Sequence, residues 1–116
     1  MKYSEIKSIL NQITDPAERL EFVMDMGREL CPIPMDKRGT EIKGCASRVE
    51  IYKEDDNYYA SADSGLVAGI VYILISIAKD NGTDNLLAEF ESLDLKLGSS
   101  RMTGVAGVIE FLGHGS

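Results

Sequence analysis

The sequence has little of several residue types on which common functions depend. Its 116 residues include two cysteines, one histidine and no tryptophan. The spacing of Cys31 and Cys45 matches neither a Cys-x-x-Cys motif nor a zinc site. The single histidine, His114, belongs to residues 113–116, which we interpret as a flexible tail. A cysteine hydrolase needs a positioned histidine base, and His114 is a poor candidate for that role.

Positive charge and long apolar runs are also scarce. The chain has 12 basic and 19 acidic residues, a formal net charge of −7. No clustered basic face is visible in the sequence, so we expect no nucleic-acid partner. The longest apolar run is far shorter than the roughly 20 residues that span a bilayer, so we expect no membrane segment. The N-terminal pattern is charged from its start and predicts no signal peptide, which favours a cytoplasmic protein with reduced thiols.

The N-terminal part of the chain predicts two helices. Ser4 is a candidate N-cap for a short first helix, and Asp15, Pro16 and Glu18 form a capping arrangement that opens a second one. Prolines that follow the second helix predict its end near Cys31. The apolar stripe of the first helix consists of Ile6, Ile9, Leu10 and Ile13. That of the second consists of Leu20, Val23, Met24, Gly27 and Leu30.

The pattern then changes to that of a β-hairpin and a buried helix. Val49 and Ile51 alternate with polar residues, and residues 58–62 read as the returning strand. Residues 66–78 are apolar on all sides, which predicts a central helix packed by sheet on one face and helices on others. Gly82, after Asn81, is a stop signal for this helix.

The C-terminal part predicts two more helices. Thr83 is a candidate cap for a short one with Leu86, Leu87 and Phe90 facing inward. Ser99 or Ser100 opens the last helix, whose buried stripe consists of Val105, Val108, Ile109 and Leu112. Helices, then a strand group, then helices predict a single α+β domain over residues 1–116, with N-terminal helices, a small antiparallel sheet and C-terminal helices.

Cys45 lies in the segment Ile42-Lys43-Gly44-Cys45-Ala46-Ser47-Arg48-Val49. Gly44 predicts a tight turn directly before the thiol. Lys43 and Arg48 flank Cys45, and nearby cations favour the nucleophilic thiolate. From these residues alone, two interpretations stand beside each other: Cys45 is a small buried hydrophobe, or it is a reactive thiol.

Four segments resemble the SufE family of sulfur-acceptor proteins. The Gly-Cys-x-Ser-x-Val pattern at residues 42–51 is similar to the family's cysteine segment. Residues 15–30 resemble its amphipathic helix, and Ala62-Asp63-Ser64 with the apolar run 66–77 resembles its Asp-Ser segment and buried helix. Leu97-Gly98-Ser99-Ser100-Arg101-Met102-Thr103-Gly104 is similar to its last helix start. The chain departs from the family at Glu50, where many members carry tryptophan, and lacks an acidic position usual after Asp63-Ser64.

The resemblance implies a SufE/NifU-like fold and a role for each matching residue. Cys45 would accept sulfur as a persulfide from a cysteine desulfurase. Arg101 would stabilise the thiolate or persulfide, although a helix-start arginine paired with a surface carboxylate is an equally ordinary interpretation. Gly44, Ser47 and Asp63 would support the cysteine loop, although loop bonding by Ser47 and helix capping by Asp63 are equally ordinary structural roles. The protein would be a sulfur carrier and activator of the desulfurase, not an enzyme. Pyridoxal phosphate would belong to the desulfurase, and an iron–sulfur assembly scaffold would receive the sulfur.

Other functions stay open from the sequence. A docking protein that regulates a desulfurase without accepting sulfur has the same pattern. A scaffold or metal-binding module sharing this general fold would use several ligating cysteines, and this chain has two. Cys31 matches no part of the motif and reads as structural at a helix end, with an oxidative link to Cys45 left open. The pattern is compatible with a monomer or a homodimer.

Overall fold

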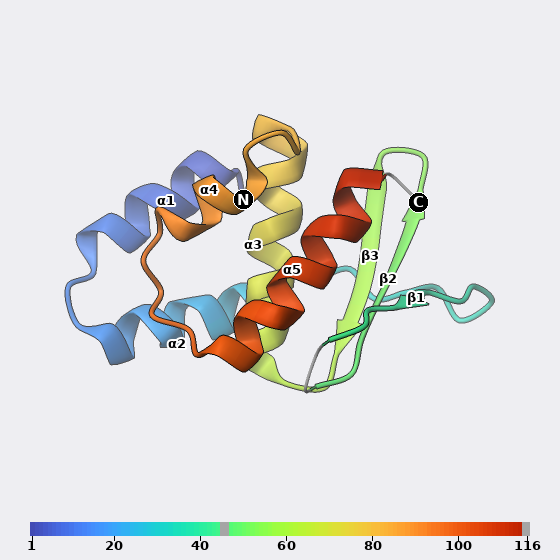
Figure 1. Cartoon of the computed structure of the whole chain (residues 1–116), viewed down its shortest axis with the longest axis horizontal. Helices are drawn as coiled ribbons and strands as arrows, with labels where there is room; N and C mark the ends of the chain where they lie inside the picture. The colour runs from blue at the N-terminus through green and yellow to red at the C-terminus, as the bar shows by residue number, and fades with distance from the viewer. Residues whose placement is uncertain (45–46, 115–116) are drawn as a thin grey trace.

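A computed structural model describes residues 1–44 and 47–114 of the chain. In these residues five helices lie to one side of a small sheet (Figure 1). The helices are α1 (Tyr3–Gln12), α2 (Pro16–Gly27), α3 (Gly65–Asn81), α4 (Leu86–Glu91) and α5 (Ser99–His114). The strands are β1 (Thr40–Glu41), β2 (Val49–Glu54) and β3 (Asn57–Ala62). This is the α+β arrangement that the sequence predicts.

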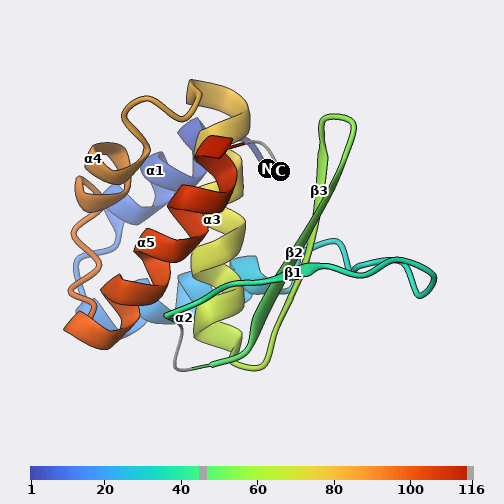
Figure 2. The same ribbon diagram turned by 45° about the vertical axis from the view of Figure 1, so that its right-hand side comes forward.

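Helix α3 is the centre of the fold. Its middle turns are buried, and it contacts α1, α2, α4, α5 and β3, as its apolar sequence predicts. The Ser64 hydroxyl caps its start by accepting a hydrogen bond from the backbone N–H of Val67. It ends at Gly82, which has a φ of 82° and donates its backbone N–H to Ala78. Figure 2 shows α3 between the sheet and the other helices.

Helices α2 and α3 approach each other closely through glycine. A Cβ built on Gly27 would lie 2.8 Å from the backbone nitrogen of Gly69. A Cβ on Gly69 would collide with the carbonyl oxygen of Val23. The absence of side chains at these two positions therefore lets the two backbones touch and fixes the position of α3 against α2.

The sheet is antiparallel in the order β1-β2-β3. Val49 pairs with Ala62 and Ile51 with Ala60. Both Val49 and Ile51 are fully buried, so the alternation in the sequence correctly predicts which face of β2 meets the core. The carbonyl oxygen of Cys31 accepts a hydrogen bond from the backbone N–H of Ala60 at 2.9 Å, so the segment after α2 follows β3.

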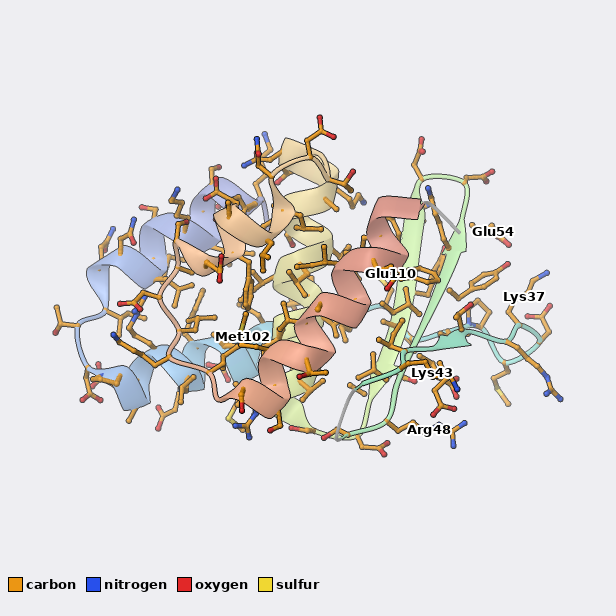
Figure 3. All side chains as sticks on the ribbon, viewed as in Figure 1. Lys37, Lys43, Arg48, Glu54, Met102 and Glu110 are labelled. Carbon is orange, nitrogen blue, oxygen red and sulfur yellow. The ribbon has the colours of Figure 1, made fainter. Side chains whose placement is uncertain are left out.

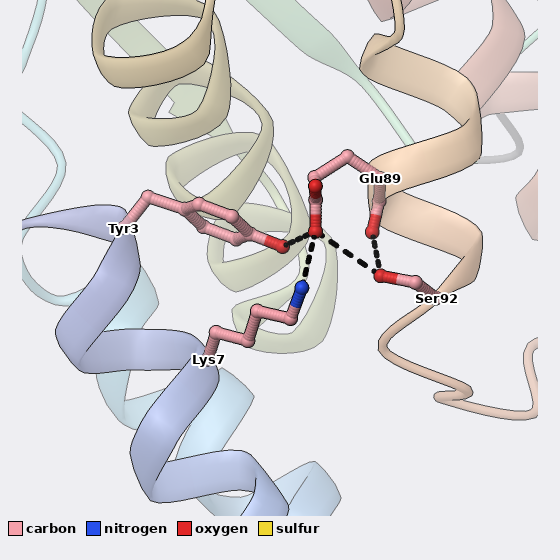
Figure 4. A network of polar contacts seen from close by, with 4 residues as sticks. All are labelled: Tyr3, Lys7, Glu89 and Ser92. Carbon is pink, nitrogen blue, oxygen red and sulfur yellow. Dashed lines mark hydrogen bonds and ion pairs between the residues drawn. The ribbon is translucent and has the colours of Figure 1, made fainter.

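A polar cluster joins α1 to α4 (Figure 4). One carboxylate oxygen of Glu89 accepts hydrogen bonds from the Tyr3 hydroxyl at 2.7 Å, the Lys7 ammonium at 2.8 Å and the Ser92 hydroxyl at 3.2 Å. The bond from Lys7, followed by that from Tyr3, lowers the pKa of Glu89. Burial and the bond to Glu89 raise the pKa of Tyr3. The cluster therefore favours a charged Glu89 and a protonated Tyr3.

Several predicted helix ends are wrong, because tertiary contacts decide them. Lys2, not Ser4, occupies the N-cap of α1, and the carboxylate of Asp80 accepts the Tyr3 N–H at 2.7 Å. Asn85, not Thr83, occupies the N-cap of α4, and its side chain makes no capping hydrogen bond. At α1 the short-range prediction fails because Asp80, distant in sequence, binds the helix start.

The end of α2 and the end of α5 also differ from the prediction. Helix α2 stops at Gly27 instead of near Cys31, and two short turns follow in which the N–H groups of Glu29 and Leu30 bond to carbonyls three residues earlier. The backbone then runs beside β3, where the Cys31 carbonyl accepts the Ala60 N–H. Helix α5 continues through His114, so Gly113 and His114 are helical where a flexible tail is expected.

Three side-chain predictions on helix faces need correction. Met26 is buried in α2, whereas Met24 is 47% exposed. Leu87 of α4 is 45% exposed, although Leu86 and Phe90 are buried as predicted. On α5 Ile109 is only partly buried, and Phe111 joins the core. In each case the residue next to the buried stripe lies at its edge, and the neighbouring element decides how far the stripe extends.

Candidate functional site

The stem of the cysteine loop is held by α5. Gly44 has a φ of 86°, the left-handed conformation expected of a glycine before the thiol. A Cβ on Gly44 would lie 3.1 Å from the side-chain methyl group of Thr103, and one on Gly107 would lie 2.6 Å from the carbonyl oxygen of Lys43. Thus α5 lies directly against the backbone that leads to the loop. Cys45 itself lies outside the described residues.

Thr103 and Gly107 are site residues that the sequence analysis missed. The Thr103 hydroxyl donates a hydrogen bond to the Ser99 carbonyl at 3.0 Å, so its methyl group can face Gly44. Gly107 reduces helix propensity in the interior of α5, and a glycine inside a helical pattern often marks a close approach of backbones. The sequence therefore indicates a close backbone contact at Gly107, but it does not show which segment makes that contact.

An apolar pocket of about 170 Å³ lies beside the other end of the loop. Ser47 lines it from the loop stem. Helix α3 contributes Val67, Ile70 and Val71, and helix α5 contributes Ser100, Arg101, Gly104, Val105 and Val108. The structure therefore brings two predicted site residues, Ser47 and Arg101, to one pocket between the N-terminal halves of α3 and α5.

The electrostatics of this pocket favour an anion. Arg101 is exposed, and among the residues that the structure describes it makes no ion pair, so the predicted alternative of a helix-start arginine bound to a surface carboxylate gains no support. Arg101 lies in the first turn of α5, where unpaired backbone N–H groups add partial positive charge. The attraction of a negative group to a guanidinium and a helix N-terminus is stronger at the rim of an apolar pocket than across open solvent, because water screens it less there.

Arg48 contributes less to this field than the sequence suggests. Its guanidinium contacts the Glu50 carboxylate at 2.6 and 3.1 Å. This hydrogen bond, followed by the attraction of the two charges, raises the pKa of Arg48. Lys43 is exposed at the stem of the loop (Figure 3), and the described residues offer it no ion pair. Of the two cations that flank Cys45 in sequence, Lys43 is therefore the less neutralised one.

Asp63 lies near the site but does not cap α3 as predicted, because Ser64 does so. The backbone N–H of Asp63 donates to the carbonyl oxygen of Arg48 at 3.2 Å, and the Asp63 carboxylate adds to the field that raises the pKa of Arg48. This bond continues the β2–β3 pairing one residue beyond Val49 and Ala62, next to the cysteine loop. Its side chain is exposed.

Cys31 lies at a different place from this pocket. It is exposed and lines a separate hollow of about 570 Å³ with residues of α1, β3 and α3, Tyr58 and Tyr72 among them. Its structural role is carried by its backbone carbonyl, which anchors the segment to β3, and not by a helix end as expected.

Across residues 1–44 and 47–114, no three His, Cys, Asp or Glu side chains gather in an arrangement suited to a metal ion. Within the same ranges, none of the helices has the length and apolar character needed to cross a bilayer.

The fold and pocket define a small α+β protein in which Gly44 lies against α5 and Ser47 lines a pocket that also contains the cation Arg101. Comparison with known families agrees with this description. Residues 4–113 match the family described as SufE, the Fe-S metabolism associated domain, and the chain belongs to this family. The match covers nearly the whole of the 116 residues and bears out the resemblance of the four sequence segments. A comparison with curated proteins finds no significant match.

Proposed function

We propose that this protein accepts sulfur on Cys45 from the persulfide of a cysteine desulfurase, stimulates that desulfurase, and passes the sulfur to iron–sulfur cluster assembly. Membership of a family associated with Fe-S metabolism supports the general role. The single observation that favours acceptance is that Ser47, from the stem of the cysteine loop, and Arg101 line one apolar pocket. An anionic thiolate or persulfide near this pocket would be stabilised by the guanidinium.

The proposed step is a thiol–persulfide exchange. The Cys45 thiolate attacks the outer sulfur of the partner's cysteine persulfide. A bond forms between Cys45 and that outer sulfur, which keeps its proton, and the bond between the two sulfur atoms of the partner breaks. The partner's cysteine leaves as a thiolate. Charge and atoms balance without an external oxidant or reductant, and a second exchange of the same kind would deliver the sulfur onward.

The protein supplies placement and electrostatics in this scheme, and the partner supplies the cofactor. Pyridoxal phosphate on the desulfurase releases sulfur from cysteine, so this chain needs no cofactor of its own. Its role is that of a sulfur carrier and activator instead of an enzyme. A free thiolate must persist between transfers, which suits a cytoplasmic protein in a reducing compartment.

Intact mass spectrometry after incubation with a cysteine desulfurase and cysteine tests the proposal. The wild type is expected to gain the mass of one sulfur atom, and reduction should remove it. Cys45→Ser is expected to gain none, whereas Cys31→Ser, the matched control, should gain sulfur as the wild type does. No gain by the wild type despite complex formation would refute acceptance and leave a regulatory docking protein. Stimulation of the desulfurase that survives in Cys45→Ser would point to the same conclusion.

A further inference from the structure

Charge is distributed unevenly along this acidic chain. Residues 35–53 contain five of the 12 basic residues but only three of the 19 acidic ones. This segment is therefore net positive, whereas the rest of the chain is more negative than the overall −7. Figure 3 shows Lys37, Lys43 and Arg48 on the sheet side of the molecule, away from α1 and α4. The positive charge on this side is thus concentrated in residues 35–53, whereas the adjoining hairpin turn, Glu54-Asp55-Asp56, is acidic.

Part of this segment is a projection. We call residues 35–43 the basic arm: the part before β1 projects beyond the sheet, away from the helices (Figure 2), and β1 and the two residues after it lead back to α5. Hydrogen bonds at 2.9 Å hold the backbone to the sheet before the arm and near its end: the carbonyl of Cys31, four residues before Met35, accepts from the Ala60 N–H, and the Ile42 N–H donates to the Val49 carbonyl. The arm is therefore anchored on both sides, and its last residue is followed directly by Gly44 and the cysteine loop.

The exposed side chains of the basic arm are suited to contact with another protein. Met35 is fully exposed, and unbranched, polarizable methionine adapts to irregular surfaces. Two carboxylates, Asp36 and Glu41, also lie on the arm. Three basic side chains are exposed, and none of them makes an ion pair with another residue in the described ranges: Lys37, Arg38 and Lys43.

We infer that the basic arm docks against an acidic surface beside the sulfur-donating cysteine of the partner desulfurase. This inference rests on the proposed function. An acidic surface attracts the arm and repels the rest of this negatively charged chain, so the encounter is oriented before contact. Because the arm continues into Gly44, the orientation that places it on the partner also presents the cysteine loop to the same place.

Charge complementarity favours a protein over a nucleic acid as the occupant. A polyanion meets a protein through many phosphate contacts, whereas the arm offers three basic side chains and the remainder of the chain repels phosphate. An apolar anchor surrounded by charged residues is the composition found at protein interfaces, where Met and Arg are enriched. The arm combines Met35 with Arg38 in this way.

The test compares two double variants that change the net charge equally. Lys37→Glu with Arg38→Glu reverses the arm, and Lys2→Glu with Lys96→Glu reverses two exposed cations of the helical side. Affinity for the desulfurase of the same organism is measured by surface plasmon resonance at about 50 and about 300 mM salt, between which screening rises strongly. We expect the arm variant to bind about tenfold more weakly at low salt and to lose most of the salt dependence. The control should bind within about twofold of the wild type, as remote surface charges do.

The outcomes separate this inference from the proposed function. Equal weakening of both variants, or an arm variant that binds like the wild type, overturns the docking inference even if Cys45 acquires sulfur. Binding through the arm without sulfur on Cys45 supports docking and refutes acceptance. Arm-dependent binding of a duplex oligonucleotide at physiological salt, with no arm-dependent binding of the desulfurase, also overturns it. Circular dichroism verifies that each variant is folded. If Lys37→Glu with Arg38→Glu is unfolded, Lys37→Gln with Arg38→Gln replaces it, and this neutral variant should weaken binding less.

Discussion

Gly107 of α5 lies against the carbonyl oxygen of Lys43, two residues before Cys45. A Cβ on Gly107 would come within 2.6 Å of that oxygen and within 2.8 Å of an Ile42 methyl group. One of these atoms belongs to the backbone and cannot rotate away, so any side chain at position 107 must displace the stem of the cysteine loop. This contact links the interior of a helix to the position of the candidate site.

Gly107→Ala is therefore expected to lower sulfur acceptance by the protein. The added methyl group displaces the backbone at Lys43, and a displacement of about 1 Å at a reacting centre can cost about a hundredfold in rate. The rate of mass gain with a desulfurase measures the loss. Gly113→Ala is the matched control in the same helix, because a Cβ there meets nothing within 4 Å. Equal rates for Gly107→Ala and the wild type would show that the contact does not position the loop.

Gly69 and Gly65 of α3 lead to a prediction about stability and not about activity. Gly69→Ala directs a methyl group onto the Val23 carbonyl and should separate α2 from α3, at a cost of about 1–3 kcal/mol or more in the free energy of unfolding. Gly65→Ala, in the same helix, meets only the Met24 terminal methyl group at 3.6 Å and should be neutral or stabilising by up to about 1 kcal/mol. Urea denaturation compares the two. A Gly69→Ala variant as stable as the wild type would mean that the helices can separate freely.

Glu89 predicts how stability changes in acid. Its pKa is lowered in the folded state below the ordinary value of 4.5, chiefly by Lys7 and then by Tyr3. A lowered carboxyl pKa contributes stability above the unfolded value, and that contribution is lost as the pH falls through the folded value. We expect Glu89→Gln to be less stable than the wild type near neutral pH and to show a weaker loss in acid. Thermal melts at several pH values below about 5 measure this difference.

Glu5 offers a control for the Glu89 prediction. It is an exposed acidic residue on α1, the helix that carries Tyr3 and Lys7 of the cluster, and its side chain accepts only the backbone N–H of Lys2 among the hydrogen bonds of the described residues. Glu5→Gln should therefore follow the acid profile of the wild type closely. Identical acid profiles for Glu89→Gln and the wild type would contradict a stabilising role for the cluster in Figure 4.

Arg101 predicts the reactivity of the candidate thiol. In a Cys31→Ser background, only Cys45 can be alkylated. Replacing Arg101 by Ala removes the cation from the pocket that Ser47 lines, so the thiolate fraction and the alkylation rate at neutral pH should fall several-fold. Lys96→Ala removes an exposed cation paired weakly with Asp94 and is the matched control. The rate of Cys45 alkylation by iodoacetamide measures the effect. Equal rates in the Arg101→Ala and Lys96→Ala variants would show that Arg101 has no effect on the thiol.

The sequence by itself determined the features that depend on near neighbours in the chain. The Asp15 cap, the alternation of Val49 and Ile51, the apolar run of α3 and its stop at Gly82 are local patterns, and the structure confirms each of them. The segments 15–30 and 66–77 also took part in the resemblance to the SufE family, whose match covers residues 4–113. Local patterns suffice there because capping, strand alternation and helix termination act within a few residues.

Only the tertiary structure decided the features that depend on residues distant in sequence. Asp80 fixes the start of α1, β3 draws Cys31 away from α2, and α5 places Gly107 beneath the stem of the cysteine loop. The pocket shared by Ser47 and Arg101 belongs to the same class. The physical reason is that close packing and charge act through space, so their partners are known only once the chain has folded.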